Sequence, residues 1–128
     1  MPCVLYLMGE TFDPASIPEL ATLRPFSSYR RGDKNPSGKA GFCEVGGVTC
    51  SVSTHEQPID QVEDASYYLT RYQALLRTLK DVEPIRYRTL SFIISARVLG
   101  AQESRMNFPP TLLRLCAEVN VGIGLVLV

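Results

Sequence analysis

Residues 42–54 read "FCEVGGVTCSVST", and this stretch decides the predicted fold. The pair Gly46-Gly47 separates two short apolar runs, which is the pattern of a two-residue β-hairpin turn. Such a turn would place Cys43 opposite Cys50 on neighbouring strands. Because a hairpin pairs its strands antiparallel, the sequence predicts a sheet that is at least partly antiparallel.

The thiols of this hairpin would face the core, because Val48, Cys50 and Val52 alternate along the apolar side of the strand. The four cysteines include no Cys-x-x-Cys pair, and the first residues do not resemble a signal peptide. The sequence therefore predicts free thiols in a reducing compartment, the cytoplasm. A redox bridge between Cys43 and Cys50, or a metal site, is the alternative.

Hydrophobic periodicity places the other main elements. Apolar residues recur at alternating intervals of three and four over positions 61–81, which predicts a helix. Positions 89–99, "TLSFIISARVL", alternate in a period of two and predict a half-buried strand. A last helix of about ten residues is predicted from Pro110, and the apolar runs at 2–10 and 122–128 are predicted as strands.

The segment between the first strand and the hairpin carries turn and cap signals. Ser16 and Glu19 have the spacing of a capping box, which predicts a short helix over 17–23. "FSSYRR" at 26–31 is predicted as a strand, and the polar residues that follow, 32–41, as a solvated loop.

The predicted order is β-α-β-β-β-α-β-α-β without an internal repeat or a linker. We therefore expect one α+β domain over residues 1–128, an antiparallel or mixed sheet with helices packed on one face. Six apolar residues are expected to share its core: Leu69, Leu76, Phe92, Ile94, Leu115 and Leu125.

Charge and hydropathy limit the classes of partner. Thirteen basic residues balance thirteen acidic ones, which argues against general nucleic-acid binding, because such binders carry a basic surplus. The apolar run at 122–128 is too short to span a bilayer, so no membrane segment is expected.

Catalytic and metal-binding patterns are weak. His55 is the only histidine, and although Ser53 lies two residues before it, no glycine turn nearby could form an oxyanion site. Cys43, Cys50 and His55 would supply three zinc ligands at best. We expect no catalytic residue, no metal ligand and no cofactor. The sequence therefore favours a protein that is not an enzyme, although it leaves an enzymatic function open.

The segment "SSYRRGDKNPSGKAG" at 27–41 is the candidate partner site. It lacks a phosphate loop, because five residues separate Gly32 from Gly38 where the motif needs four, and Ala40 stands where the metal-binding hydroxyl belongs. Gly32 would permit a positive φ, and the next residue's carboxylate would accept backbone N–H groups. One of two alternating arginines should point outward and suit a carboxylate on a partner. The predicted partner-binding residues are Tyr29, Arg30, Arg31 and Asp33; a merely solvated basic strand end is the alternative.

Three tyrosines of the long helix, Tyr67, Tyr68 and Tyr72, allow a different function. Aromatic side chains on a binding face can stack a base or line a pocket, although at helical spacing they also suit the core and its rim. The alternative function is a small-ligand or nucleotide-binding protein, or an enzyme, with a pocket lined by tyrosine and arginine.

The order of three short motifs resembles the bacterial domain of unknown function 4279 family over nearly the whole chain. The motifs are Phe12-Asp13-Pro14 before a short helix, Tyr29-Arg30-Arg31-Gly32-Asp33, and Phe108-Pro109 at the start of the last helix. The resemblance implies a fold, but it carries no catalytic residue to this chain. Some members look like cargo of toxin-immunity loci, which implies a small cytoplasmic bacterial protein that binds and blocks a protein partner.

Overall fold

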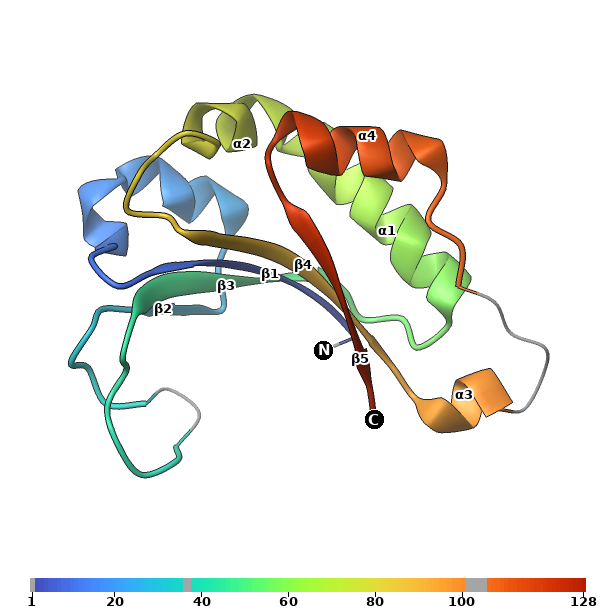
Figure 1. Cartoon of the computed structure of the whole chain (residues 1–128), viewed down its shortest axis with the longest axis horizontal. Coiled ribbons are helices and arrows are strands. Elements are labelled where there is room, and N and C mark those ends of the chain that lie inside the picture. Colours follow the sequence, from blue (N-terminus) through green and yellow to red (C-terminus); the bar gives the residue numbers. More distant parts are fainter. Residues whose placement is uncertain (1, 36–37, 101–105) are drawn as a thin grey trace.

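The computed structural model describes residues 2–35, 38–100 and 106–128 (Figure 1). Part of the predicted loop at 32–41, and residues 101–105 before the last helix, lie outside these residues. The strands are β1 (Cys3–Gly9), β2 (Ser27–Tyr29), β3 (Gly46–Ser53), β4 (Tyr87–Ile94) and β5 (Gly122–Leu127). The α-helices are α1 (Pro58–Arg71), α2 (Gln73–Leu79), α3 (Ala96–Gly100) and α4 (Pro110–Glu118), and two 3-10 helices are η1 (Pro14–Ser16) and η2 (Pro18–Leu23).

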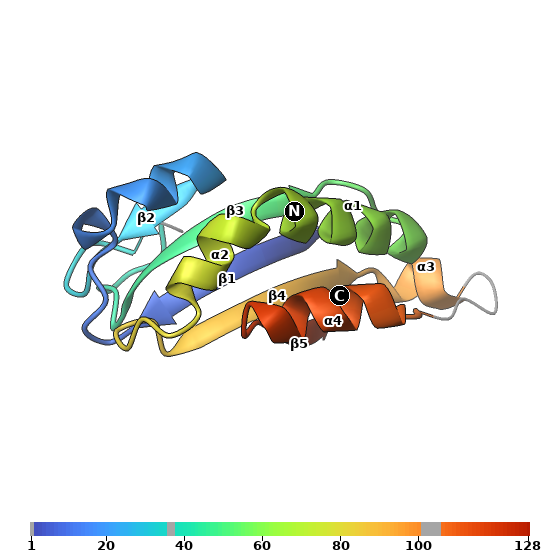
Figure 2. The same ribbon diagram turned by 90° about the horizontal axis from the view of Figure 1, so that it is seen from above.

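The strands form one mixed sheet in the order β2-β3-β1-β4-β5. β1 pairs antiparallel with both β3 and β4, and β2 pairs antiparallel with β3. β5 runs parallel to β4, because the chain returns through α4 before it enters β5. Figures 1 and 2 show α1, α2, α4 and both 3-10 helices on one face of the sheet. The predicted α+β fold with helices on one face is confirmed.

The two faces of the sheet differ in composition because side chains alternate along each strand. Leu5 of β1 lies opposite Cys50 of β3 and Leu90 of β4, and all three are fully buried beneath the helices. On the other side, Tyr6 lies opposite Thr49 and Thr89. We call this second side the open face; it carries Tyr6, Thr49, Thr89 and Ser91.

The predicted hairpin at 42–54 is wrong. β3 begins at Gly46 and continues to Ser53, so the two glycines start a strand. A Cβ atom on Gly46 would lie 1.8 Å from the carbonyl oxygen of Phe12, so this glycine permits a close approach of two backbones. Cys43 instead pairs with Asp33 through its backbone N–H, at 2.8 Å from the carbonyl oxygen, and does not face Cys50.

Two long predicted elements are each divided in the structure. The helix expected over 61–81 begins earlier, at Pro58, and a break at Tyr72 (φ −103°, ψ 13°) separates α1 from α2. The strand expected over 89–99 ends at Ile94, and α3 follows. The backbone N–H of Val128 donates to the carbonyl oxygen of Ile94 at 3.0 Å, and that of Ala96 donates to the carbonyl oxygen of Val128 at 2.8 Å, so pairing with the last strand continues to the start of α3.

The start of the early helix also differs from the prediction. Ser16 ends η1, where its hydroxyl donates to the carbonyl oxygen of Asp13, and it forms no capping box with Glu19. The cap is Asp13, whose carboxylate accepts the N–H of Ala15 at 3.0 Å.

The predicted core is correct for four of its six residues. Leu69, Leu76, Phe92 and Ile94 are buried, and Leu115 packs against them while partly exposed. Leu125 is 52% exposed, because β5 is the outer strand of the sheet and its alternation gives no burial there. Within the described residues, no helix is long and apolar enough to cross a membrane.

Candidate functional site

The turn predicted at the end of β2 is present. Gly32 adopts φ +90°, and the carboxylate of Asp33 accepts the backbone N–H of Arg30 at 2.7 Å. The backbone N–H of Asp33 also donates to the carbonyl oxygen of Arg30 at 3.1 Å. The structural part of the prediction is therefore confirmed, and the Asp33 carboxylate already has a backbone partner inside the turn.

Arg30 and Arg31 are both exposed, although alternation predicted that only one would point outward. The reason is that β2 ends at Tyr29, so neither arginine lies in a strand. Among the residues that the structure describes, neither guanidinium has a hydrogen bond or an ion pair. Both forks are therefore free to bind a carboxylate from outside the chain.

Tyr29 lies in a cavity of about 470 Å³ on the open face of the sheet. Figure 1 shows the loop between β2 and β3 on this side, away from the helices. The loop and three strands together line the cavity, through Tyr6, Phe26, Ser27, Tyr29, Asn35, Cys43, Glu44, Val45 and Thr49. This volume is within the range of protein pockets that hold a ligand or a large side chain.

The backbone of β3 passes close to the Tyr29 side chain at Gly47. A Cβ atom on Gly47 would lie 3.0 Å from the Tyr29 hydroxyl oxygen, so this glycine leaves room for the ring. Burial raises the pKa of Tyr29, and a hydrogen bond to Thr49 acts in the opposite direction. The hydroxyl therefore stays protonated at neutral pH and can donate to a bound group.

Two exposed phenylalanines accompany the cavity, and sequence reasoning missed them. Phe26 lines it and is 53% exposed, while Phe42, beside the lining residue Cys43, is 69% exposed. The sequence carried no clear signal for them, because both lie in segments predicted as strands, where an apolar side chain is expected to be buried. With Tyr29 and the two arginines, they give this surface the composition of a binding hot spot.

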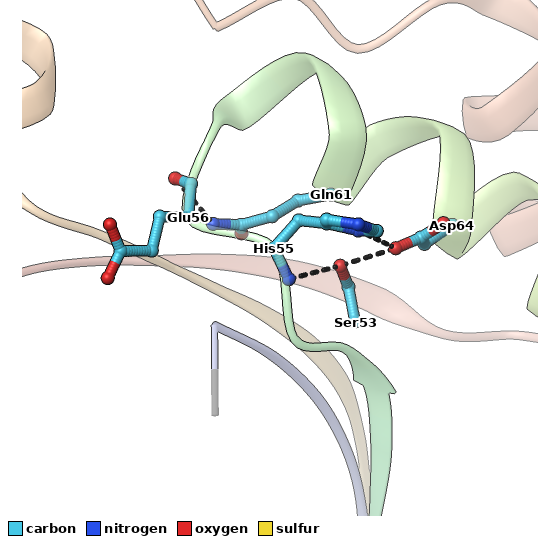
Figure 3. Close-up of polar contacts among 5 residues, drawn as sticks. All are labelled: Ser53, His55, Glu56, Gln61 and Asp64. Carbon is cyan, nitrogen blue, oxygen red and sulfur yellow. Dashed lines mark hydrogen bonds and ion pairs between the residues drawn. The ribbon is translucent and has the colours of Figure 1, made fainter.

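Ser53 and His55 both contact Asp64 of α1, as Figure 3 shows. The Ser53 hydroxyl donates to Asp64 Oδ2 at 2.7 Å, and His55 Nδ1 lies 2.7 Å from the same oxygen. The Ser53 oxygen also accepts the backbone N–H of His55 at 3.2 Å. Because the serine proton goes to the carboxylate, the imidazole does not activate Ser53 as a nucleophile.

The electrostatics of this cluster stabilise the junction between β3 and α1. The hydrogen bond to Asp64, and its charge, raise the pKa of His55 above the usual 6.5. Although partial burial acts to raise the pKa of Asp64, hydrogen bonds from Ser53 and His55 bring it below the usual 3.8. We call the cluster the Ser53–His55–Asp64 clamp, because it joins the end of β3 to α1. The spacing of these residues in the sequence did not predict that Asp64 would contact the other two.

The cysteines Cys3, Cys43, Cys50 and Cys116 are all free thiols. Burial raises the pKa of Cys3 to about 12 and those of Cys50 and Cys116 to about 11, so these three stay protonated. Cys43 is the partly exposed one, and its thiol lies 3.8 Å from the carbonyl oxygen of Lys34. Among the described residues no group of three His, Cys, Asp or Glu side chains could hold a metal ion.

Two tyrosines of α1 and the tyrosine at the break that follows it line a second hollow of about 260 Å³ on the helix side of the molecule. Tyr67, Tyr68 and Tyr72 meet Arg24 and Arg71 there. The pocket of tyrosine and arginine that the sequence allowed is therefore present, between η2, α1 and β3.

Comparison of the chain with family models, with curated proteins and with solved structures gives no match. The resemblance to the domain of unknown function 4279 family stays a prediction.

Proposed function

We propose that this chain is a small non-enzymatic bacterial protein of the cytoplasm that binds and blocks a protein partner, as an immunity protein does. The observation that supports the proposal best is the cavity on the open face, which has exposed aromatic residues beside it. Two arginines follow its lining residue Tyr29 and make no ion pair with any described residue. Such a combination is typical of the few residues that supply most of the energy of a protein interface.

The proposed surface implies a particular chemistry for the partner. An apolar side chain of the partner would enter the cavity beside Tyr29, and Phe26 and Phe42 would cover it. A carboxylate next to that side chain would pair with Arg30 or Arg31, whose planar forks bind carboxylates through two parallel hydrogen bonds. The partner is therefore expected to carry an apolar anchor flanked by acidic residues.

A capture experiment tests this function with a matched control. The chain serves as bait in an extract of its own organism, beside the variants Phe42→Ser, Arg30→Ala and Ile59→Ser. Phe42 and Ile59 are both 69% exposed, so each serine variant removes an exposed apolar side chain, one from the loop between β2 and β3 and the other from α1. A partner of the cavity is expected to bind the chain and Ile59→Ser but to lose at least tenfold in affinity, about 1.4 kcal/mol, with the other two.

Two outcomes would contradict the function. A partner that binds Phe42→Ser and Arg30→Ala as tightly as the chain itself would place the interface elsewhere. Failure to capture any protein beyond abundant chaperones, with a bait that unfolds cooperatively in a denaturant melt, would remove the support for a protein partner.

A further inference from the structure

The second hollow lies where η2, α1 and the outer part of β3 meet, away from the cavity proposed to bind a protein. Its volume is about 260 Å³. The residues that line it are Leu23, Arg24, Ser51, Val52, Asp64, Tyr67, Tyr68, Arg71 and Tyr72. None of them lines the first cavity, so the two surfaces can be tested independently.

Two arginines, Arg24 and Arg71, line this hollow. Arg24 and Arg71 make no ion pair with any residue that the structure describes. The guanidinium carbon of Arg71 lies 5.3 Å from the centre of the Tyr72 ring, so a cation–π contact holds this side chain beside the hollow. Arg24 follows η2 in a left-handed conformation, at φ 51°.

Positive charge exceeds negative charge in the lining. Asp64 is the one acidic residue among the lining residues, and Ser53 and His55 already occupy its Oδ2 atom. Two arginines against one aspartate leave a surplus of one positive charge, and when His55 is protonated its charge is offset by that of Asp60. Asp60 lies close enough to His55 to favour that protonation. An anionic group would restore the balance.

Aromatic rings supply the second half of the site. Tyr68 is buried and its ring centre lies 4.7 Å from that of Tyr72, so the two rings form a fixed floor. Tyr67 is 68% exposed, so its ring has a free face. A flat aromatic group bound between the arginines would stack on such a ring.

We propose that this hollow binds a small ligand that joins a phosphate to an aromatic ring, the chemistry of a mononucleotide. The phosphate lies between Arg24 and Arg71, and the base stacks on Tyr67. Because the hollow is smaller than a whole nucleotide pocket, the sugar stays at its mouth in contact with solvent. Stacking accepts any base, so purine and pyrimidine mononucleotides bind with similar affinity.

Isothermal titration of the full chain with AMP, UMP, adenosine and inorganic phosphate tests the site. AMP and UMP are expected to bind within about fivefold of each other, and adenosine and phosphate at least tenfold more weakly than either. Equal binding of AMP and adenosine, equal binding of AMP and phosphate, or binding of none of the four would overturn the proposal.

Variants show whether binding uses this hollow. Arg24→Gly removes a guanidinium while glycine accepts φ 51° without strain, and Arg71→Gln keeps a good helix former in α1. Each is expected to weaken AMP at least tenfold, and Tyr67→Ala about fivefold or more, while Tyr67→Phe keeps the stacking ring. Arg114→Ala on α4 is the matched surface control. Thermal melts of each variant separate lost binding from lost folding, and unchanged AMP affinity in both folded arginine variants would overturn the assignment.

Discussion

The two faces of the sheet perform different tasks. The helix-covered face carries Leu5, Leu90 and Phe92, whose side chains are fully buried and make no contact with solvent. The open face carries Tyr6, Thr49 and Thr89 on the same strands, and beside it lies the cavity around Tyr29. Alternation along the strands therefore separates the apolar residues beneath the helices from the more polar residues of the open face, of which Thr49 is itself buried at 6% exposure.

Neighbouring residues of β4 give the largest expected contrast between the faces. Leu90→Ala removes a buried side chain and is expected to lower the free energy of unfolding by about 2–5 kcal/mol. Thr89→Val changes the open face, keeps the β-branch, and is expected to stay within about 0.5 kcal/mol of the unchanged chain. Denaturant melts measure both, and equal losses would mean that the two faces have been distinguished wrongly.

The close backbone approach at the start of β3 gives the next effect. Gly46→Ala would place a methyl group against the Phe12 carbonyl, and it is expected to cost about 1–3 kcal/mol as the backbone shifts. An alanine there that leaves the denaturant melt unchanged would contradict this packing. The prediction that the glycine pair forms a hairpin turn would then have to be considered again.

The Ser53–His55–Asp64 clamp predicts the smallest effect, a dependence of stability on pH. The folded pKa of His55 lies above its unfolded value of 6.5, so its contribution is complete below that pH and is lost as the pH rises through the folded pKa. The stability difference between the chain and His55→Ala is therefore expected to be larger at pH 5.5 than at pH 8.5. A difference that grows toward alkaline pH would contradict the hydrogen bond to Asp64.

Much of the fold follows from sequence patterns, and the misread parts have physical reasons. The helical stripe at Leu69 and Leu76 and the start of α4 at Pro110 were predictable, because periodicity and caps act locally. The pair Gly46-Gly47 was misread because glycine serves a tight turn and a close backbone approach equally well. Leu125 was placed in the core because an entirely apolar strand does not reveal that it lies at the edge of a sheet.

The candidate sites were predictable only in part. The turn at Arg30 to Asp33 follows from local chemistry, and the structure has it. The cavity beside it joins β1, β2, β3 and a loop, so no local pattern could place Tyr6 next to Tyr29. Asp64 contacts His55 from another element, nine residues away, for the same reason.

Hydrogen exchange of the captured complex tests the central claim, that the open-face cavity is the binding surface, most directly. The amides of residues 26–35 and 42–45 are expected to exchange more slowly in the complex than in the free chain, while those of α1 and α4 keep their rates. Slower exchange over α1 and α4, with the loop between β2 and β3 unchanged, would contradict the claim and place the partner on the helices.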